Sequence, residues 1–170
     1  MKKPKKIFLV GPMGAGKSAV GRHLARELHL TFVDSDDEVE SRTGVDIPFI
    51  FEKEGEEGFR KREAAAIDDL SKLEDVVLAT GGGAVVTAEN RNHLGGRGFV
   101  VYLYTSVDQQ FSRTVRGRER PMLDGGDPRD ILENLLAVRD PLYREIADLI
   151  VETDGRKVKS VADEIIEHVS

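Results

Sequence analysis

An eight-residue glycine-rich segment near the start of the chain limits what this sequence can fold into more than any other feature. Residues 11–18 read Gly-Pro-Met-Gly-Ala-Gly-Lys-Ser, which matches the pattern G-x-x-x-x-G-K-[ST] at every defined position. The apolar run 7–10 leads directly into this segment, and a helical pattern follows it, with Val20, Leu24 and Leu28 four residues apart. A glycine-rich turn that happens to precede a helix is the alternative. Because a strand, this pattern and a helix occur together, we favour a phosphate-binding loop.

The residue types in this segment suit the phosphates of a nucleotide and a magnesium ion. Glycines let the backbone curl so that its N–H groups face the phosphates, and the following helix contributes a partial positive charge. Lys17 can reach the β- and γ-phosphates, and the hydroxyl of Ser18 can ligate Mg²⁺. The expected nucleotide-binding residues are Gly14, Ala15, Gly16, Lys17, Ser18 and Ala19.

Size, charge and cysteine content narrow the class of protein further. A chain of 170 residues has the length of one domain, and no internal repeat or linker divides residues 1–170. The formal net charge of −6 argues against a nucleic-acid-binding protein, and the absence of cysteine excludes a disulfide framework or a cysteine zinc site. Only four apolar residues follow the lysines at positions 2, 3, 5 and 6, which is too few for a signal peptide. We expect a cytoplasmic monomer with no membrane partner.

Apolar runs that alternate with helical patterns predict a parallel sheet. The runs are largely continuous, as expected for strands that are covered on both faces. Candidate strands are residues 7–10, 31–33, 76–79, 99–103 and 149–151. Candidate helices are residues 17–29, 36–42, 47–71, 87–94, 106–116, 128–146 and 160–169, the last with Ser160 as its N-cap. The pattern predicts an α/β fold in three layers, of the type found in P-loop nucleotide-binding proteins, with a five-stranded parallel sheet between two layers of helices.

Two aspartates follow the second predicted strand, where ligands of such sheets bind. Asp34 and Asp36 are two residues apart. One carboxylate can hold Mg²⁺ through water while the other accepts a hydrogen bond from a substrate hydroxyl and takes its proton. Asp34 is the better metal candidate, because the third strand ends in threonine and glycines and offers no acid. Helix capping is the alternative role, since acidic residues suit the start of a helix.

Two glycine-containing segments come after the third and fourth predicted strands. Gly81–Gly83 makes either a tight turn or a place where a small ligand presses against the backbone, and three successive glycines favour the ligand. The segment 113–127 is rich in glycine and holds Arg113, Arg116, Arg118 and Arg120. We predict a mobile lid whose arginines clamp phosphate, with a solvated helix end as the alternative for one or two of them.

Two further arginines have ordinary interpretations when each is considered alone. Arg60 lies among four glutamates between residues 54 and 63, so a surface ion pair is its default role. Arg139 precedes Asp140 in a helical pattern, where a salt bridge is equally compatible with the sequence.

Four more segments give the chain a specific resemblance to a known family. They are I-x-x-I-F-x-x-x-G-E-x-x-F-R-x-x-E at residues 47–63, V-L-A-T-G-G-G-A-V at 77–85, R-P-M-L at 120–123 and R-D-P-L-Y at 139–143. Together with the phosphate-binding loop, they make the chain resemble the shikimate kinases over nearly its whole length. Two departures remove no required role: Met122 replaces a common leucine, and Ala19 replaces a second hydroxyl residue.

The resemblance implies a reaction and a set of site residues. The reaction is transfer of the γ-phosphoryl group of ATP to the 3-hydroxyl of shikimate, which gives shikimate 3-phosphate and ADP. The implied catalytic residues are Lys17, Asp34, Asp36 and Arg120, and the implied metal ligands are Ser18 and, through water, Asp34. Arg113, Arg120 and Arg156 join the residues that bind ATP. The implied shikimate-binding residues are Asp36, Arg60, Gly81, Gly82, Gly83 and Arg139, and residues 34–61 form a helical shikimate-binding segment.

Three alternative functions stay open at this point. Another small-molecule kinase on the same scaffold is the first, although the triple glycine and the two isolated arginines argue against it. A GTP-binding switch is the second, but such proteins usually carry an Asn-Lys-x-Asp motif, which this chain lacks. A non-catalytic protein that kept the fold is the third. The sequence also leaves open which aspartate takes the proton.

Overall fold

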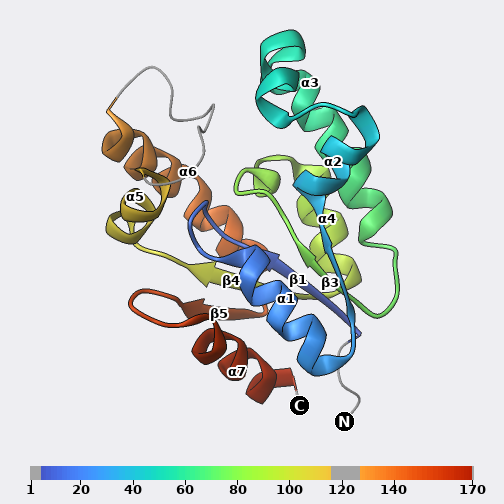
Figure 1. The fold of residues 1–170 in the computed structure, drawn as a ribbon, viewed down its shortest axis with the longest axis vertical. Helices are drawn as coiled ribbons and strands as arrows, with labels where there is room; N and C mark the ends of the chain where they lie inside the picture. Colours follow the sequence, from blue (N-terminus) through green and yellow to red (C-terminus); the bar gives the residue numbers. More distant parts are fainter. Residues whose placement is uncertain (1–4, 116–126, 170) are drawn as a thin grey trace.

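Within residues 5–115 and 127–169, which the computed structural model describes, five parallel strands form one sheet (Figure 1). The strands are β1 (Lys6–Val10), β2 (Thr31–Asp34), β3 (Val76–Ala79), β4 (Phe99–Tyr104) and β5 (Leu149–Glu152). Their order across the sheet is β2-β3-β1-β4-β5, and every neighbouring pair is parallel. The strand β1 is therefore central, and the glycine-rich loop that follows it emerges between the ends of β3 and β4.

Helices cover both faces of the sheet, as the sequence predicted. Successive side chains of a strand point to opposite faces. Ile7 and Leu9 of β1 accordingly pack in the core under α1 (Lys17–Leu28) and α7 (Val158–Val169). Phe8 and Val10 pack in the other core, under α3 (Ile47–Leu70), α4 (Ala88–Arg97) and α6 (Pro128–Ile146). The remaining helical elements are α2 (Ser35–Thr43), the 3₁₀ turn η1 (Ala84–Val86) and α5 (Val107–Val115). The expected three-layer α/β fold is confirmed.

The register of the sheet brings three strand ends to the same level. Leu9 of β1 and Asp34 of β2 are both paired with Ala79 of β3, so these three residues lie in one row. Asp34 lies in this row, and the glycine-rich loop, Asp36 and the triple glycine follow just beyond it. Their positions therefore follow from strand pairing alone. In Figure 1, α2 and the first part of α3 extend away from the sheet.

Two details of the helices differ from the expectation. Ser160 was predicted as the N-cap of the last helix, but α7 begins earlier, at Val158. Arg156 explains the difference, because its guanidinium donates to the hydroxyl (3.1 Å) and carbonyl (3.0 Å) of Ser160 and so binds the first turn of the helix. The second difference is a kink in α3 at Gly55, where φ is 72° and ψ is −177°. A positive φ of this size favours glycine.

The predicted lid and the expected absence of a membrane partner concern particular segments of the chain. The predicted lid at residues 113–127 lies mostly outside the residues that the structure describes, since these omit residues 116–126, Arg120 included. Among the described helices, none combines the length and the apolar character that crossing a membrane requires.

Candidate active site

The glycine-rich loop after β1 has the backbone shape of a phosphate-binding loop. Gly11, Gly14 and Gly16 have φ values of 149°, 82° and 85°, which other residues rarely adopt. The helix α1 begins directly after Gly16, so its unpaired N–H groups and its positive end lie at the loop. Lys17 donates through Nζ to the carbonyls of Gly11 (2.6 Å) and Pro12 (2.8 Å), which holds its ammonium group against the loop. A phosphate at this position meets backbone donors and a cation together.

Asp34 has two roles at the junction of β2 and α2. Its Oδ2 accepts a hydrogen bond from the hydroxyl of Ser18 at 2.9 Å. Its Oδ1 accepts from the backbone N–H groups of Asp36 (2.8 Å) and Asp37 (3.2 Å), so Asp34 is the N-cap of α2. The capping role that the sequence analysis weighed against metal binding is therefore real, but it uses only one of the two carboxylate oxygens. The other oxygen lies beside the phosphate-binding loop.

The donor set at this junction fits Mg²⁺. Magnesium takes oxygen ligands, keeps several waters, and is usually held by one or two protein oxygens together with substrate phosphates. The hydroxyl of Ser18 and the Oδ2 atom of Asp34 are two such oxygens, already in contact with each other. Within the described residues no group of three or more His, Cys, Asp or Glu side chains could hold a metal. An ion shared with nucleotide phosphate needs no such group, so the chemistry of these residues matches the predicted metal site.

A buried cluster of acids and arginines lies next to the loop. Arg60, whose side chain is 14% exposed, donates through Nη1 to Glu63 Oε1 at 2.9 Å and contacts Glu56 Oε2 at 3.3 Å. The ion-pair interpretation of Arg60 is therefore correct, but the pair is not a surface pair, because Glu63 is completely buried. Glu63 was not predicted as a site residue. Its spacing of three from Arg60 on one helix was the available signal, and such spacing is common on solvated helices.

Two carboxylate oxygens of this cluster have no hydrogen-bond partner in the described structure. They are Asp36 Oδ1 and Glu63 Oε2, and both are buried. Burial, and then the negative charge of Asp34, raises the pKa of Asp36 to about 6. Burial also raises the pKa of Glu63 to about 7, although the Arg60 guanidinium opposes this shift. Buried polar atoms are almost always paired in folded proteins. These two oxygens are thus ready acceptors for the hydroxyl groups of a ligand.

Each glycine of the triple-glycine segment faces a different neighbour. A Cβ atom at Gly81 would lie 2.7 Å from Asp36 Oδ1, and one at Gly82 would lie 3.2 Å from the backbone nitrogen of Met13. A Cβ atom at Gly83 would collide with the guanidinium of Arg60. The segment does make a tight turn, which the N–H of Ala84 closes on the carbonyl of Gly81 at 3.1 Å, and close approach accounts for glycine at each of its three positions. The groups that approach are the acid, the arginine and the phosphate-binding loop.

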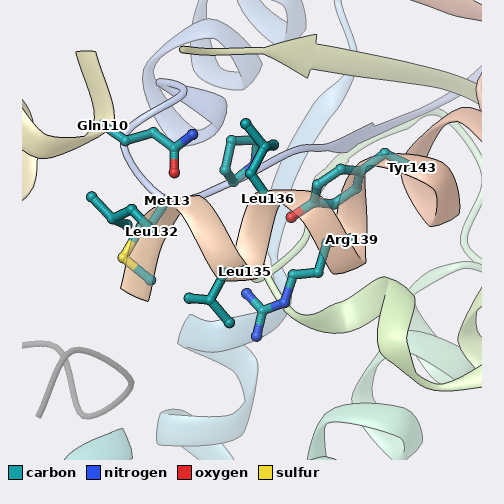
Figure 2. A pocket seen from close by; sticks show the side chains of 8 residues that line it. Met13, Gln110, Leu132, Leu135, Leu136, Arg139 and Tyr143 are labelled. Atoms are coloured by element: carbon teal, nitrogen blue, oxygen red, sulfur yellow. The ribbon is translucent and has the colours of Figure 1, made fainter. Parts of the chain in front are cut away.

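Arg139 reaches the same region from the opposite side. It lies within α6 with only 5% of its surface exposed, and its guanidinium lies beside the phenol of Tyr143. The phenol in turn donates to the carbonyl of Gly82 at 2.5 Å. Figure 2 shows both side chains projecting from α6 beside a small cavity lined mainly by residues of that helix, three leucines among them. The salt-bridge interpretation does not describe Arg139, because the side chain is buried against a tyrosine. Tyr143 was not predicted as a site residue.

The arginines assigned to the nucleotide lie in different surroundings. Arg113 donates through Nη1 to the carbonyl of Gly14 at 2.5 Å, so it lies against the phosphate-binding loop. Arg156 follows β5 and donates to Glu152 and Glu164 besides Ser160, so its partners belong to β5 and α7. Its assignment to the nucleotide stays a prediction.

These observations together define a class of protein. A phosphate-binding loop, with the oxygens of Ser18 and Asp34 beside it, stands at the centre of a parallel sheet, and a cluster of acids and arginines lies next to it. The first feature binds a nucleoside triphosphate, and the second binds a small molecule that carries an anionic group and hydroxyls. The fold and the site are those of a P-loop kinase that phosphorylates a small molecule.

Comparison with known proteins gives the family. A sequence model of shikimate kinases matches residues 13–170, and the chain belongs to the shikimate kinase family. A shikimate kinase of Shewanella sp. strain ANA-3 is 59% identical over 169 residues, which cover 99% of each chain. The structure of shikimate kinase from Acinetobacter baumannii in complex with shikimate superimposes with a TM-score of 0.94 at 51% identity, covering 96% of this chain and 92% of that one. Shikimate kinase from Aquifex aeolicus gives a TM-score of 0.84 at 38% identity, covering 95% and 94%.

Proposed function

We propose that this chain transfers the γ-phosphoryl group of ATP to the 3-hydroxyl of shikimate, which yields shikimate 3-phosphate and ADP. ATP-dependent phosphorylation of shikimate, in the biosynthesis of aromatic amino acids, is the activity of its family. One observation carries the assignment to this site: Arg60, which is half-buried, and Arg139, which is buried, flank the triple glycine, next to Asp36 and beside the phosphate-binding loop.

At the nucleotide end, charge neutralisation is the main task. We propose that Lys17 and the amino terminus of α1 bind the β- and γ-phosphates, with Arg113 against the loop. Mg²⁺, held by Ser18 and through water by Asp34, supplies positive charge to the phosphate oxygens when it is bound. Arg120, which lies outside the described residues, is assigned to the phosphates from the family resemblance alone.

At the acceptor end, opposite charges select the substrate. The carboxylate of shikimate is proposed to bind Arg60 and Arg139, whose guanidinium groups suit planar carboxylates. The ring hydroxyls then face Asp36 and Glu63, whose unpaired oxygens accept hydrogen bonds. In this arrangement the arginines face the substrate carboxylate, and the acids face its hydroxyl groups.

The same geometry supports one aspartate over the other as the group that takes the proton. Both oxygens of Asp34 are already engaged, one by Ser18 and one by the amino terminus of α2. Asp36 has an unpaired oxygen, and its pKa of about 6 lies close to neutral pH, where a general base works best. We therefore propose that Asp36 accepts the proton of the attacking hydroxyl. All of these groups belong to one chain, which supports a monomer as the active unit.

A panel of acceptors tests the proposal against a rival kinase on the same scaffold. ADP release would be measured in a coupled assay with shikimate, quinate, gluconate and a nucleoside monophosphate. We expect shikimate to give a value of kcat/KM at least a hundredfold above the others, because a buried polar site strongly rejects ligands that leave its groups unpaired. A sugar acid or a nucleotide as the preferred acceptor would move the chain to another activity.

A further inference from the structure

The phenol oxygen of Tyr143 joins two parts of the proposed acceptor site. The tyrosine side chain is buried, with 1% of the residue exposed. Its hydroxyl donates to the carbonyl of Gly82 at 2.5 Å, and the guanidinium of Arg139, four residues earlier on α6, lies beside the same phenol. A carbonyl can only accept and a guanidinium can only donate. The phenol proton therefore goes to Gly82, and the phenol oxygen turns its lone pairs, not its proton, toward the cation of Arg139.

The ring of Tyr143 is held so that this oxygen cannot move away. It stacks on Tyr102 with ring centroids 4.7 Å apart. The contact is between the rings, and the hydroxyl of Tyr102 makes a separate hydrogen bond, to Asp140 Oδ1 at 2.7 Å. Asp140 also accepts from Arg144 Nε at 2.8 Å. Since Tyr143 lies four residues after Arg139 on α6, the helix sets the spacing between the phenol and the guanidinium.

We propose that Tyr143 is a positioning residue for the acceptor carboxylate, which fixes the guanidinium of Arg139 and the backbone of the triple glycine relative to each other. The inference rests on the proposed function, because it assigns the carboxylate of shikimate to Arg139. Arg139 is on α6 and Gly82 follows β3, so without Tyr143 these two parts of the site would be joined only through the packing of separate elements.

The bond to Gly82 has a second effect on the same site. The carbonyl of Gly82 and the N–H of Gly83 belong to one peptide unit. A strong hydrogen bond to a carbonyl polarises its peptide, and linked hydrogen bonds strengthen one another in a low-dielectric interior. The N–H of Gly83 thus becomes a better donor to an anion, at a residue whose α-carbon lies next to the Arg60 guanidinium.

The substitution Tyr143→Phe tests the proposal, because it keeps the ring and removes only the oxygen. We expect the KM for shikimate to rise about tenfold, as when a hydrogen bond to a charged group is lost. The KM for ATP should stay within about twofold, because the phosphate-binding loop keeps its own contacts. The thermal shift that shikimate gives to the folded variant should shrink correspondingly.

Tyr102→Phe is the matched control. It removes a hydroxyl and a hydrogen bond from the other ring of the same stack, without touching Gly82 or Arg139. We expect it to lower thermal stability by a similar amount and to leave the KM for shikimate unchanged. An unchanged shikimate KM in Tyr143→Phe, or an equal rise in Tyr102→Phe, would reduce Tyr143 to a packing residue and overturn the proposal.

A second variant keeps the test open if Tyr143→Phe does not fold. Placing 3-fluorotyrosine at position 143 retains the ring and the hydrogen bond to Gly82 but makes the phenol a stronger donor and a weaker acceptor. We expect the shikimate KM of this variant to change by about twofold or more, which corresponds to a few tenths of a kcal/mol in binding free energy. The same amino acid at position 102 should leave the shikimate KM unchanged. No change at either position would contradict the proposal. A wild-type protein that does not phosphorylate shikimate at all would overturn the proposed function, and this inference with it.

Discussion

Gly83 shows how closely the residues of the acceptor site approach one another. A Cβ atom there would occupy the space of the Arg60 guanidinium, which is the far end of a flexible side chain. A clash of this kind is relieved by moving the arginine rather than the backbone. The residue therefore matters for the placement of a functional group more than for the stability of the fold.

We predict that Gly83→Ala raises the KM for shikimate about tenfold or more while the protein remains folded. The physical reason is that the displaced guanidinium loses its alignment with the substrate carboxylate, and charged hydrogen bonds of this kind contribute about 1.5–3 kcal/mol each. Gly96→Ala is the control, because a Cβ atom at Gly96 in α4 meets no atom within 4 Å. Steady-state kinetics and urea unfolding of both variants check the prediction. Equal shikimate kinetics in the two variants would contradict it.

Residue types alone predicted the nucleotide end of the site better than the acceptor end. The phosphate-binding loop is local, since one eight-residue segment supplies the glycines, the lysine and the hydroxyl. Glu63 and Tyr143 act through contacts with residues that are distant in sequence, such as Asp36 and Gly82. A glutamate on a charged helix and a tyrosine on an apolar stripe have the same pattern whether or not they reach a site. Their roles became visible only with the fold.

At the scale of the elements, the junction of β2 and α2 combines structure and chemistry in one side chain. Asp34 caps α2 with one oxygen and holds Ser18 with the other. Asparagine caps helices as well as aspartate does, whereas alanine does not cap them. Two substitutions at one position can therefore separate the two roles.

We predict that Asp34→Asn keeps the free energy of unfolding within about 0.5 kcal/mol of the wild type. The same substitution should raise the Mg²⁺ concentration for half-maximal activity about 10–100-fold, as expected when an outer-shell ligand is changed. Asp34→Ala should lose the metal function to the same extent and, in addition, about 1 kcal/mol of unfolding free energy. Titration of activity with Mg²⁺ and urea unfolding provide the two readouts. If Asp34→Asn kept the Mg²⁺ dependence of the wild type, Asp34 would be a capping residue only.

The elements themselves were largely predictable from the sequence. Continuous apolar runs predicted all the strands within a residue of their ends, because strands covered on both faces carry that pattern. The misplaced N-cap Ser160 and the kink at Gly55 depend on a neighbouring arginine and on one glycine, so the periodicity of apolar residues does not report them. The order of the strands likewise depends on which edges pair, and it was left unpredicted.

At the scale of the whole molecule, the buried acids of the acceptor site lower the free energy of unfolding of the ligand-free protein at high pH. The folded-state pKa of Glu63 is about 7, raised from 4.5, so the folded protein holds this proton more tightly than the unfolded chain does. The corresponding stability is fully present below pH 4.5 and is lost as the pH rises through 7. Arg60 reduces the cost but does not remove it.

We predict that Glu63→Gln flattens part of this pH dependence. At pH 5 the variant and the wild type should differ little, because Glu63 is protonated in the folded wild type. At pH 8 the free energy of unfolding of the variant should exceed that of the wild type by on the order of 2–3 kcal/mol, since one pKa unit corresponds to about 1.4 kcal/mol. Urea unfolding of both proteins at the two pH values, without ligands, checks the difference. A difference that is the same at both pH values would show that Glu63 does not titrate with a raised pKa.

The dependence of ADP release on shikimate tests the central claim most directly. Purified protein would be given ATP and Mg²⁺ with and without shikimate, and the product would be identified by mass and by ³¹P resonance. We predict that ADP forms slowly without shikimate, that its release rises saturably as shikimate is added, and that one shikimate 3-phosphate appears per ADP. ADP release at the same rate with and without shikimate, or no phosphorylated shikimate, would contradict the account.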